Sequence, residues 1–207
     1  MTPPVPAELV ERAARLADSS GRALLGLTGP PGAGKSTLAT GLVEALGGGA
    51  VLVPMDGFHL DDVVLDALGR RDRKGAPDTF DAGGYVALLR RLRDRSEEVV
   101  YAPEFRRELE IAAAGAVAVP RDVPLIVTEG NYLLYDGPFA PVRGLLDETW
   151  FLDVDPTQRQ LRLVARHVGH GRSPEAARRW VETTDEPNAR LVERTRAAAS
   201  LVVRLPA

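Results

Sequence analysis

Residues 29–37 read Gly-Pro-Pro-Gly-Ala-Gly-Lys-Ser-Thr, written "GPPGAGKST". The stretch matches the pattern G-x-x-x-x-G-K-[ST] in full, and it lies between an apolar strand candidate at 22–29 and a helical pattern at 35–46. Glycines at these positions let successive backbone N–H groups converge on phosphate oxygens, and the helix N-terminus adds a partial positive charge. A plain glycine-rich turn is the other interpretation, but motif and context together favour a phosphate-binding loop (P-loop).

Each P-loop position has an expected part in binding a nucleoside triphosphate with magnesium. Lys35 is expected to reach the β- and γ-phosphates, and the hydroxyl of Ser36 is a candidate ligand for Mg²⁺. The candidate nucleotide-binding residues are Gly29, Gly32, Ala33, Gly34, Lys35, Ser36 and Thr37. A P-loop alone does not choose among kinases, switches and motors.

Missing motifs narrow the class of P-loop protein. The only asparagines of the chain are Asn131 and Asn188, and neither opens the N-K-x-D motif that reads guanine in GTPases. An L-S-G-G-Q signature of the ABC type is also absent, and 207 residues leave no room for the additional domains of a motor. A small ATP-dependent enzyme or switch fits these observations.

The chain around the P-loop alternates short apolar strands with helices. Further strand candidates lie at 50–55, 123–130, 148–155 and 200–205, and helical patterns cover 7–18, 60–68, 81–93, 156–168 and 174–181. Ser173 is the expected N-cap of the last helix, with proline at its first position. Continuous apolar strands separated by helices predict an α/β fold with a parallel sheet covered on both faces. Residues 96–122 break the alternation, and either a small hairpin or a long loop fits them.

Composition bounds the remaining choices. The 207 residues, 44% of them hydrophobic, suffice for a single domain with a proper core. A net charge of −3 argues against a nucleic-acid partner, and the lack of cysteine excludes disulfides and thiolate sites. We see neither a signal peptide nor an apolar run of membrane-spanning length, so we expect no membrane association and a cytoplasmic location.

Two acids follow strands of the predicted sheet. Ligands of a doubly wound sheet bind at the carboxyl ends of its strands, so Asp56 and Glu129 are expected near the P-loop. Glu129 is placed for a magnesium-bound water or for the acceptor, and Asp56 for the proton of an acceptor hydroxyl. Gly57 would let the backbone turn sharply, while Phe58 and His59 are candidate walls of an acceptor pocket. The alternatives are an ordinary strand-terminal acid for Glu129 and a helix N-cap for Asp56, although Asp61 and Asp62 suit a cap better.

Several segments together resemble one family. They are "GPPGAGKSTLA", "VPMDGFHLDD", "RKGAPDTFD", "YAPEFRR", "VTEGNYLL", "FLDVD" and "DEPNARLVERTR", and they span most of residues 22–205. This combination resembles the phosphoribulokinase/uridine kinase-like small-molecule kinases, including bacterial pantothenate kinase. The resemblance implies a P-loop three-layer α/β/α fold with a five-stranded parallel sheet, an ATP–Mg²⁺ site, and possible assembly as a homodimer. It also implies a single kinase domain over 1–207, with an acceptor-site insert at about 57–120 and a mobile helical lid at about 159–180.

The resemblance also assigns residues. It implies that Asp56 acts as the base for the acceptor, with "RKGAPDTFD" bordering the acceptor pocket and adenine near Asn188 and Thr195. The substrate-binding candidates are Asp56, Phe58, His59, Lys74, Asp78, Arg106, Glu129 and Tyr132, with Asp81 beside them. "YAPEFRR" departs from the family's aromatic-Asp-Arg pattern, because Arg106 replaces the acid, and this weakens a nucleoside assignment. The chain is also shorter than pantothenate kinase, and it resembles bacterial members labelled sugar (fructose) kinases.

The helix at 156–168 has two predicted faces. Its apolar face is expected to hold Leu161, Val164, Ala165 and Val168, and its basic stripe Arg159, Arg162 and Arg166. Arg172 follows in a glycine-rich turn. Basic groups beside an ATP site stabilise charge on the transferring phosphoryl group, so Arg166 and Arg172 are catalytic candidates together with Asp56 and Lys35. The alternative is a solvated helix face.

The sequence thus predicts a kinase that uses ATP and Mg²⁺, the latter held by Ser36 and Glu129. The expected acceptor is a hydroxyl of a small molecule of nucleoside or sugar type. Two alternatives stay open: a kinase for a pantothenate-like alcohol, and an ATP-dependent switch without catalysis.

Overall fold

The core of the molecule is a five-stranded parallel sheet with the strand order β2-β5-β1-β6-β7. The computed structural model describes residues 4–18 and 21–204. The strands are β1 (Ala23–Thr28), β2 (Ala50–Pro54), β5 (Leu125–Glu129), β6 (Glu148–Leu152) and β7 (Leu201–Val203). This confirms the predicted α/β class and the five strands read from the sequence.

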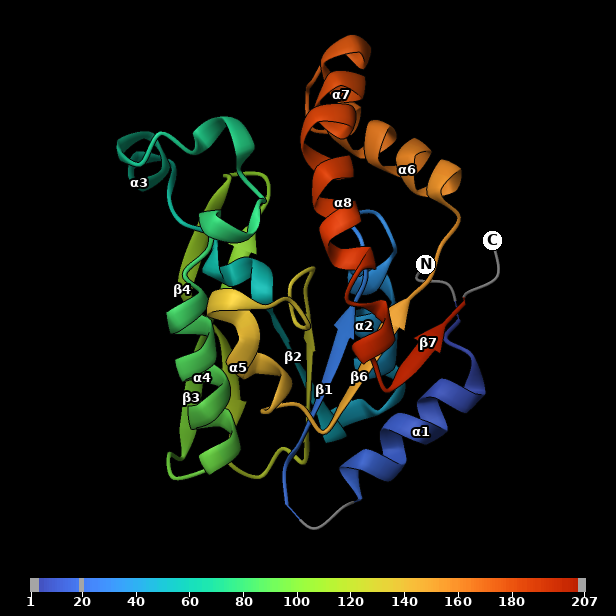
Figure 1. Cartoon of the computed structure of the whole chain (residues 1–207). Coiled ribbons are helices and arrows are strands. Elements are labelled where there is room, and N and C mark those ends of the chain that lie inside the picture. The colour runs from blue at the N-terminus through green and yellow to red at the C-terminus, as the bar shows by residue number, and fades with distance from the viewer. Residues whose placement is uncertain (1–3, 19–20, 205–207) are drawn as a thin grey trace.

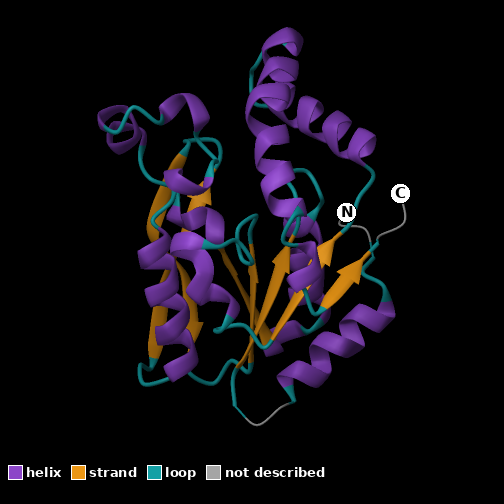
Figure 2. Ribbon diagram, viewed as in Figure 1, coloured by secondary structure: helices purple, strands orange, loops and turns teal. Residues whose placement is uncertain are grey.

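Helices cover both faces of the sheet, as Figures 1 and 2 show. On one face α1 (Ala7–Ala17) and α2 (Lys35–Ala45) pack on alternate strand residues such as Leu25 and Trp150. On the other, α4 (Ala82–Asp94) and the short α5 (Ala140–Arg143) pack on Leu24 and Ile126. Every residue of β1 and β5 is buried, because helices cover the sheet on both faces. This is the pattern of a parallel sheet between two helical layers.

Residues 96–122 form a hairpin, which decides between the two alternatives left by the sequence. Its strands are β3 (Val99–Arg106) and β4 (Ile111–Pro120), paired antiparallel outside the main sheet. Together with α3 (Asp62–Ala67) the hairpin forms one flank of the molecule (Figure 1). The side chain of Asp61 caps α3 by accepting from the Val63 N–H, so Asp56 is free for another role.

The opposite flank consists of helices. α6 (Pro156–Gly169) and α7 (Pro174–Trp180) are followed by a π-helical turn (Val181–Asp185) and α8 (Glu186–Glu193). Ser173 caps α7 as predicted, by accepting from the Ala176 N–H. Among the described residues, no helix is both long and apolar enough to cross a membrane.

The predicted faces of α6 were wrong. Leu161 and Val168, assigned to the apolar face, are 61% and 39% exposed, whereas Leu163 and Arg159 are fully buried. The helix turns this second side toward the P-loop, where a Cβ at Gly32 would lie 2.8 Å from Leu163 and 3.0 Å from Arg159. Arg159 belongs to a buried face because its long aliphatic stem packs as an apolar group.

Candidate active site

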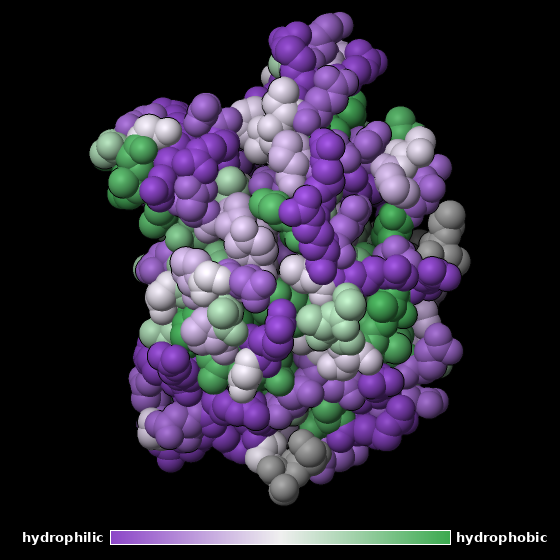
Figure 3. All heavy atoms as spheres, in the orientation of Figure 1, coloured by the Kyte–Doolittle hydropathy of each residue, from purple (hydrophilic) through white to green (hydrophobic). Residues whose placement is uncertain are grey.

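A cleft of about 880 Å³ lies at the carboxyl ends of the central strands. The P-loop borders it on the side of the sheet, the hairpin and residues 59–75 on one flank, and α6 to α8 on the other. In the space-filling view these flanks stand apart above the body of the molecule (Figure 3). The cleft therefore occupies the place where a doubly wound sheet binds its ligands.

The P-loop has the conformation of an anion cradle. Gly32 and Gly34 have φ angles of +81° and +91°, which a residue with a side chain rarely adopts. Gly34 is also the N-cap of α2, so the first N–H groups of that helix lie beside the cleft. The loop thereby offers backbone donors and a helix terminus to a phosphate group.

Lys35 is the buried cation of this cradle. Its ammonium donates to the carbonyls of Gly29 (2.9 Å) and Pro30 (3.2 Å) and to Oδ1 of Asn131 (2.7 Å). Burial lowers its pKa to about 8, although the charges of Glu129 and Asp56 act against that change. A buried ammonium with a lowered pKa is a site that an anion would stabilise, and this fits a nucleotide phosphate.

Ser36 and Glu129 form the candidate magnesium site. The Ser36 hydroxyl donates to Oε1 of Glu129 at 2.9 Å. Burial raises the pKa of Glu129, and the nearby charge of Asp56 adds to the increase. Hydroxyl and carboxylate oxygens suit Mg²⁺, which usually takes one or two protein ligands and completes its shell with phosphate oxygens and water. No group of three or more His, Cys, Asp or Glu side chains suited to a metal occurs in the described parts of the chain, which agrees with so sparse a donor set.

Asp56 lies on the hairpin side of the cleft, in a 3-10 turn (Met55–Phe58) directly after β2. Its Oδ2 accepts a 2.8 Å hydrogen bond from Nη2 of Arg107, in the turn of the hairpin. Burial acts to raise the pKa of Asp56, but the positive charges of His59, Arg107 and Lys35 outweigh it and hold the pKa below its usual value. Asp56 is therefore a charged carboxylate near neutral pH, able to accept a hydrogen bond from a hydroxyl.

Gly57 has a different role from the predicted one. Its φ is not in the left-handed region, so the turn does not need glycine. A Cβ at this position would instead lie 2.4 Å from the carbonyl oxygen of Pro103 in β3. Gly57 is required because the hairpin backbone passes directly over it, and this contact brings Arg107 to Asp56.

Aromatic rings and ion pairs form the rest of the cleft wall on the hairpin side. His59 stacks between Phe80 and Phe105, with ring centroids 4.1 and 4.6 Å away, and its Nδ1 lies 2.8 Å from the carbonyl oxygen of Asp56. Burial lowers the pKa of His59. Lys74 lies over the Phe105 ring, 5.3 Å from its centroid, and donates to Oδ1 of Asp62 at 2.8 Å. His59 and Lys74 therefore line the cleft as predicted, but each already has partners in the wall.

The flank formed by α6 to α8 contributes a second set of charges. Arg166 and Arg172 both line the cleft. Arg172 lies over the Trp180 ring at 4.0 Å, whereas Arg166 has no hydrogen-bond or ion-pair partner among the residues that the structure describes. Burial lowers the pKa of Arg166, and the charge of Arg107 is the next cause. Asn188 is buried at the border of the cleft, close to the hydrogen bond between Nε2 of His167 and Oδ2 of Asp185, 2.8 Å long.

The structure brings most of the predicted site residues together. Those that line the cleft are Gly32, Gly34, Lys35, Ser36, Thr37, Asp56, His59, Lys74, Glu129, Arg166, Arg172 and Asn188. They come from segments spread over more than 150 positions of the chain, and the crossover connections of the sheet place them at one edge.

The structure places other predicted residues away from the cleft lining. Phe58 packs edge-on against Tyr85, and the buried Tyr132 donates its hydroxyl to the carbonyl of Gly75 at 2.6 Å. Asp78 pairs with Arg70 and Arg73 on the outside of the insert. Phe58 and Tyr132 therefore make contacts in the core, and Asp78 makes ion pairs at the surface. The sequence motifs that contain these residues do not reveal such contacts.

The remaining differences follow from backbone geometry. Gly29 and Ala33 belong to the P-loop but are packed against the body, Gly29 beside Leu152. Asp81 accepts from the Gly84 N–H as the N-cap of α4. Arg106 is exposed, and Thr195 borders a separate hollow beside α8.

Among the cleft residues that sequence reasoning did not select are Phe105, Arg107, Asn131 and Asp185. Asn131 stands in the quoted "VTEGNYLL" segment, two positions after Glu129, where a strand-end polar residue could have been selected. Side chains of a strand alternate between its faces, so Phe105 and Arg106 at the end of β3 take opposite sides, and Arg107 begins the turn that follows. The sequence left a hairpin and a loop equally open, and so gave no reason to use that alternation.

The comparisons with known proteins extend over nearly the whole chain. No protein-family model matches it. It is 31% identical over 209 residues to a Schizosaccharomyces pombe protein named "Putative uridine kinase C227.14", covering 95% of this chain and 89% of that one. It is 32% identical to "Uncharacterized protein YggC" of Escherichia coli, covering 89% and 78%. The crystal structure of a "putative fructose transport system kinase" from Silicibacter sp. TM1040 superimposes with a TM-score of 0.87 at 38% identity, covering 95% and 98%.

Proposed function

The chain belongs to the uridine kinase-like family of P-loop kinases, and we propose that it transfers the γ-phosphate of ATP, bound with Mg²⁺, to a hydroxyl group of a small molecule. The observation that carries the proposal is the position of two carboxylates, the buried Glu129 and the partly buried Asp56, on the cleft beside one P-loop lysine. Glu129 accepts a hydrogen bond from Ser36, on the side where magnesium would bind. Asp56 lines the cleft on the hairpin side, where we place the acceptor.

The residues have complementary parts in this reaction. Lys35, Arg166 and the P-loop N–H groups stabilise the charge of the phosphates. Ser36 and Glu129 would hold the cation, which would supply positive charge to the phosphates. Asp56 accepts the proton of the acceptor hydroxyl while the oxygen of that hydroxyl forms the new bond to the γ-phosphorus. The bond between the γ-phosphorus and ADP breaks in the same step, and ADP leaves. Asp56 suits this part because its pKa lies below the usual value, so it carries its charge near neutral pH.

The acceptor we propose is a nucleoside or a sugar, which are the two classes that the names of the relatives contain. The wall of the cleft supports the sugar type. Phe80, Phe105 and Trp180 stack on another ring or on a cation, and Phe80 is almost fully buried, so these rings offer little open surface to a base. Charged and polar groups, which suit a polyhydroxylated molecule, make up most of the remaining lining.

The test is ADP release in the presence of Mg²⁺-ATP and a panel of acceptors. The panel contains nucleosides, free sugars, sugar acids and pantothenate-like alcohols, with Lys35→Met as the inactive control. We expect one class of acceptor to stimulate ADP release strongly over the basal hydrolysis. If no acceptor changes the rate, and a partner protein binds only in the presence of ATP, the chain is the nucleotide switch instead.

A further inference from the structure

Arg107 contacts Asp56 from another element of the structure, the hairpin. It is the first residue of the turn that joins β3 to β4, directly after the exposed Arg106. Its guanidinium donates to Asp56 at 2.8 Å, while the side chain remains 41% exposed. One hydrogen bond of a partly exposed group in a turn is a contact that a stronger partner can replace.

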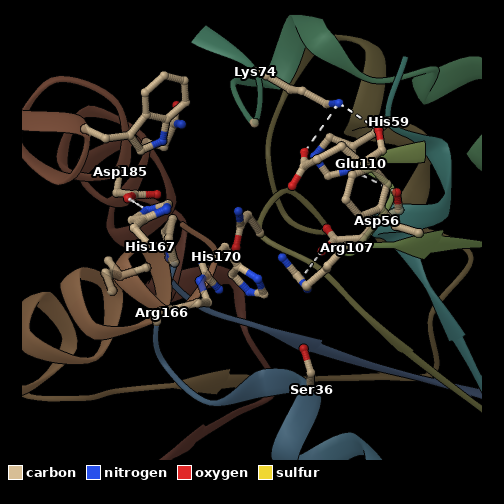
Figure 4. A pocket seen from close by; sticks show the side chains of 18 of the residues that line it. Ser36, Asp56, His59, Lys74, Arg107, Glu110, Arg166, His167, His170 and Asp185 are labelled. Carbon is tan, nitrogen blue, oxygen red and sulfur yellow. Dashed lines mark hydrogen bonds and ion pairs between the residues drawn. The ribbon is translucent and has the colours of Figure 1, made fainter. Parts of the chain in front are cut away.

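Arg107 also faces Arg166 across the cleft. Figure 4 shows Arg107 reaching into the pocket from the hairpin side and Arg166 from the lid side. The charge of Arg107 is, after burial, the largest cause that lowers the pKa of Arg166, so the two guanidiniums lie close enough to repel each other. The charges of Asp185, Asp56 and Glu129 act against that repulsion, but within the described chain none of them forms a hydrogen bond or ion pair with the Arg166 side chain.

The three cations of the cleft converge on one region. Lys35 lies at the P-loop, and the charges of both Arg107 and Arg166 contribute to the lowering of its pKa. Three mutually repelling cations, of which the Arg166 side chain has no hydrogen-bond or ion-pair partner in residues 4–18 and 21–204, are stabilised by an anion placed among them. A terminal phosphoryl group held by the P-loop would carry its charge into this region.

We propose that Arg107 leaves Asp56 when ATP binds and contacts the γ-phosphate together with Arg166, and that this exchange frees Asp56 for the acceptor hydroxyl. The inference rests on the proposed function, which supplies the triphosphate. Arg107 is then a catalytic residue contributed by the hairpin and not by the lid. In the nucleotide-free protein its ion pair holds Asp56 in place, and with ATP bound the same side chain stabilises the phosphoryl group.

The first test compares the affinities of a non-hydrolysable ATP analogue and ADP, both with Mg²⁺, by titration calorimetry. This measurement needs no acceptor. We expect Arg107→Gln to weaken binding of the analogue by about tenfold or more, as for the loss of one charge-assisted hydrogen bond, and to leave ADP binding nearly unchanged. Arg107→Lys keeps the charge and retains part of the affinity. Arg106→Gln is the matched control, because this neighbour is exposed and outside the cleft lining, and it binds both nucleotides like the wild type.

The second test uses the partner of Arg107. Asp56→Asn releases Arg107, so binding of the ATP analogue tightens. If the exchange takes place, that gain is smaller in the Arg107→Gln background, because a double-mutant cycle isolates the coupling between the two side chains. An equal gain in both backgrounds shows only relief of repulsion between Asp56 and phosphate, and overturns the proposal.

The outcomes separate this inference from the proposed function. Equal loss of ADP and analogue binding in Arg107→Gln would show that Arg107 does not read the γ-phosphate. Unchanged analogue binding with a raised KM for the acceptor alone would place Arg107 on the acceptor. Either result overturns the exchange but leaves the kinase proposal standing, whereas a wild-type protein that binds neither nucleotide would refute both.

Discussion

The ammonium of Lys35 donates a 2.7 Å hydrogen bond to Oδ1 of Asn131, which lies 96 positions away and just beyond the end of β5. This bond joins the P-loop to the strand end that carries Glu129. It also helps to hold the lysine in a buried position, where its pKa falls to about 8. The buried cation of the P-loop is therefore titratable near pH 8, with consequences for the pH dependence that we expect of nucleotide binding.

Nucleotide affinity should depend on pH through Lys35. A bound phosphate stabilises the ammonium and raises its pKa above the value of about 8 in the free protein, so binding takes up a proton when the pH is near or above that value. Below about pH 7 the lysine is already charged and the affinity should be nearly constant, and above about pH 9 it should fall by about tenfold per pH unit. Calorimetry with an ATP analogue, in two buffers of different ionisation enthalpy, measures both the affinity and the proton uptake.

Lys35→Met is the control for this effect. It should bind the analogue weakly, without the proton uptake attributed to Lys35. A wild-type affinity that stays constant up to pH 10 would show that the lysine keeps its ordinary pKa in the folded protein.

Asp56→Asn should lower turnover with the identified acceptor by about 100- to 10,000-fold, the usual contribution of a positioned base. The amide keeps the shape of the side chain but cannot take the proton, so the loss should appear in kcat, while binding of the ATP analogue persists. Steady-state kinetics and calorimetry on the same preparation separate the two. Near-normal turnover would remove Asp56 from the role of base.

Gly32→Ala should destabilise the protein more than Gly34→Ala does. Both residues have positive φ angles of similar size, so the backbone strain of an alanine is comparable. At Gly34 a Cβ has no neighbour within 4 Å, whereas at Gly32 it would lie 2.8 Å from Leu163 and push α6 from the P-loop. We expect Gly32→Ala to cost about 1–3 kcal/mol more in the free energy of unfolding, measured by urea denaturation. Equal losses in the free energy of unfolding would show that α6 moves away from the P-loop without an energetic penalty.

Arg159→Met should destabilise the protein through the carboxylate it leaves behind. Arg159 is 1% exposed, is paired with Glu186, and donates to the carbonyl of Pro31 at 3.3 Å. Methionine replaces the stem but not the charge, so we expect a loss of about 1–3 kcal/mol in the free energy of unfolding. Adding Glu186→Gln should recover part of that loss, because it removes the unpaired charge. A double variant less stable than the single one would contradict this explanation.

The fold could be read from the sequence because its signals are local. The P-loop sits between an apolar strand and a helix, and Ser173-Pro174 opens α7, so propensity and capping place these elements without reference to the rest of the chain. The five continuous apolar strands likewise indicate burial on both sides. The hairpin could not be decided, because β4 is mostly exposed and rich in alanine, so its residues show no clear alternation.

The faces of α6 show where periodicity misleads. Leu161 and Val168 lie on the more apolar-looking side, but the helix buries the side that carries Arg159 and Leu163. The choice depends on what the helix meets, here the P-loop at Gly32, and on the ability of an arginine stem to pack as an apolar group.

The sequence by itself determined the parallel sheet, the P-loop and the two acids at strand ends, because each depends on residues close together in the chain. Only the tertiary structure decided that Arg107 and not Arg106 reaches Asp56, that Asn131 holds Lys35, and that the Arg166 side chain is left without a hydrogen-bond or ion-pair partner among the residues described. These relationships join segments that are distant along the chain, and they depend on strand register and on the close passage of the hairpin over Gly57. Such contacts arise from packing in three dimensions, which local propensity does not encode.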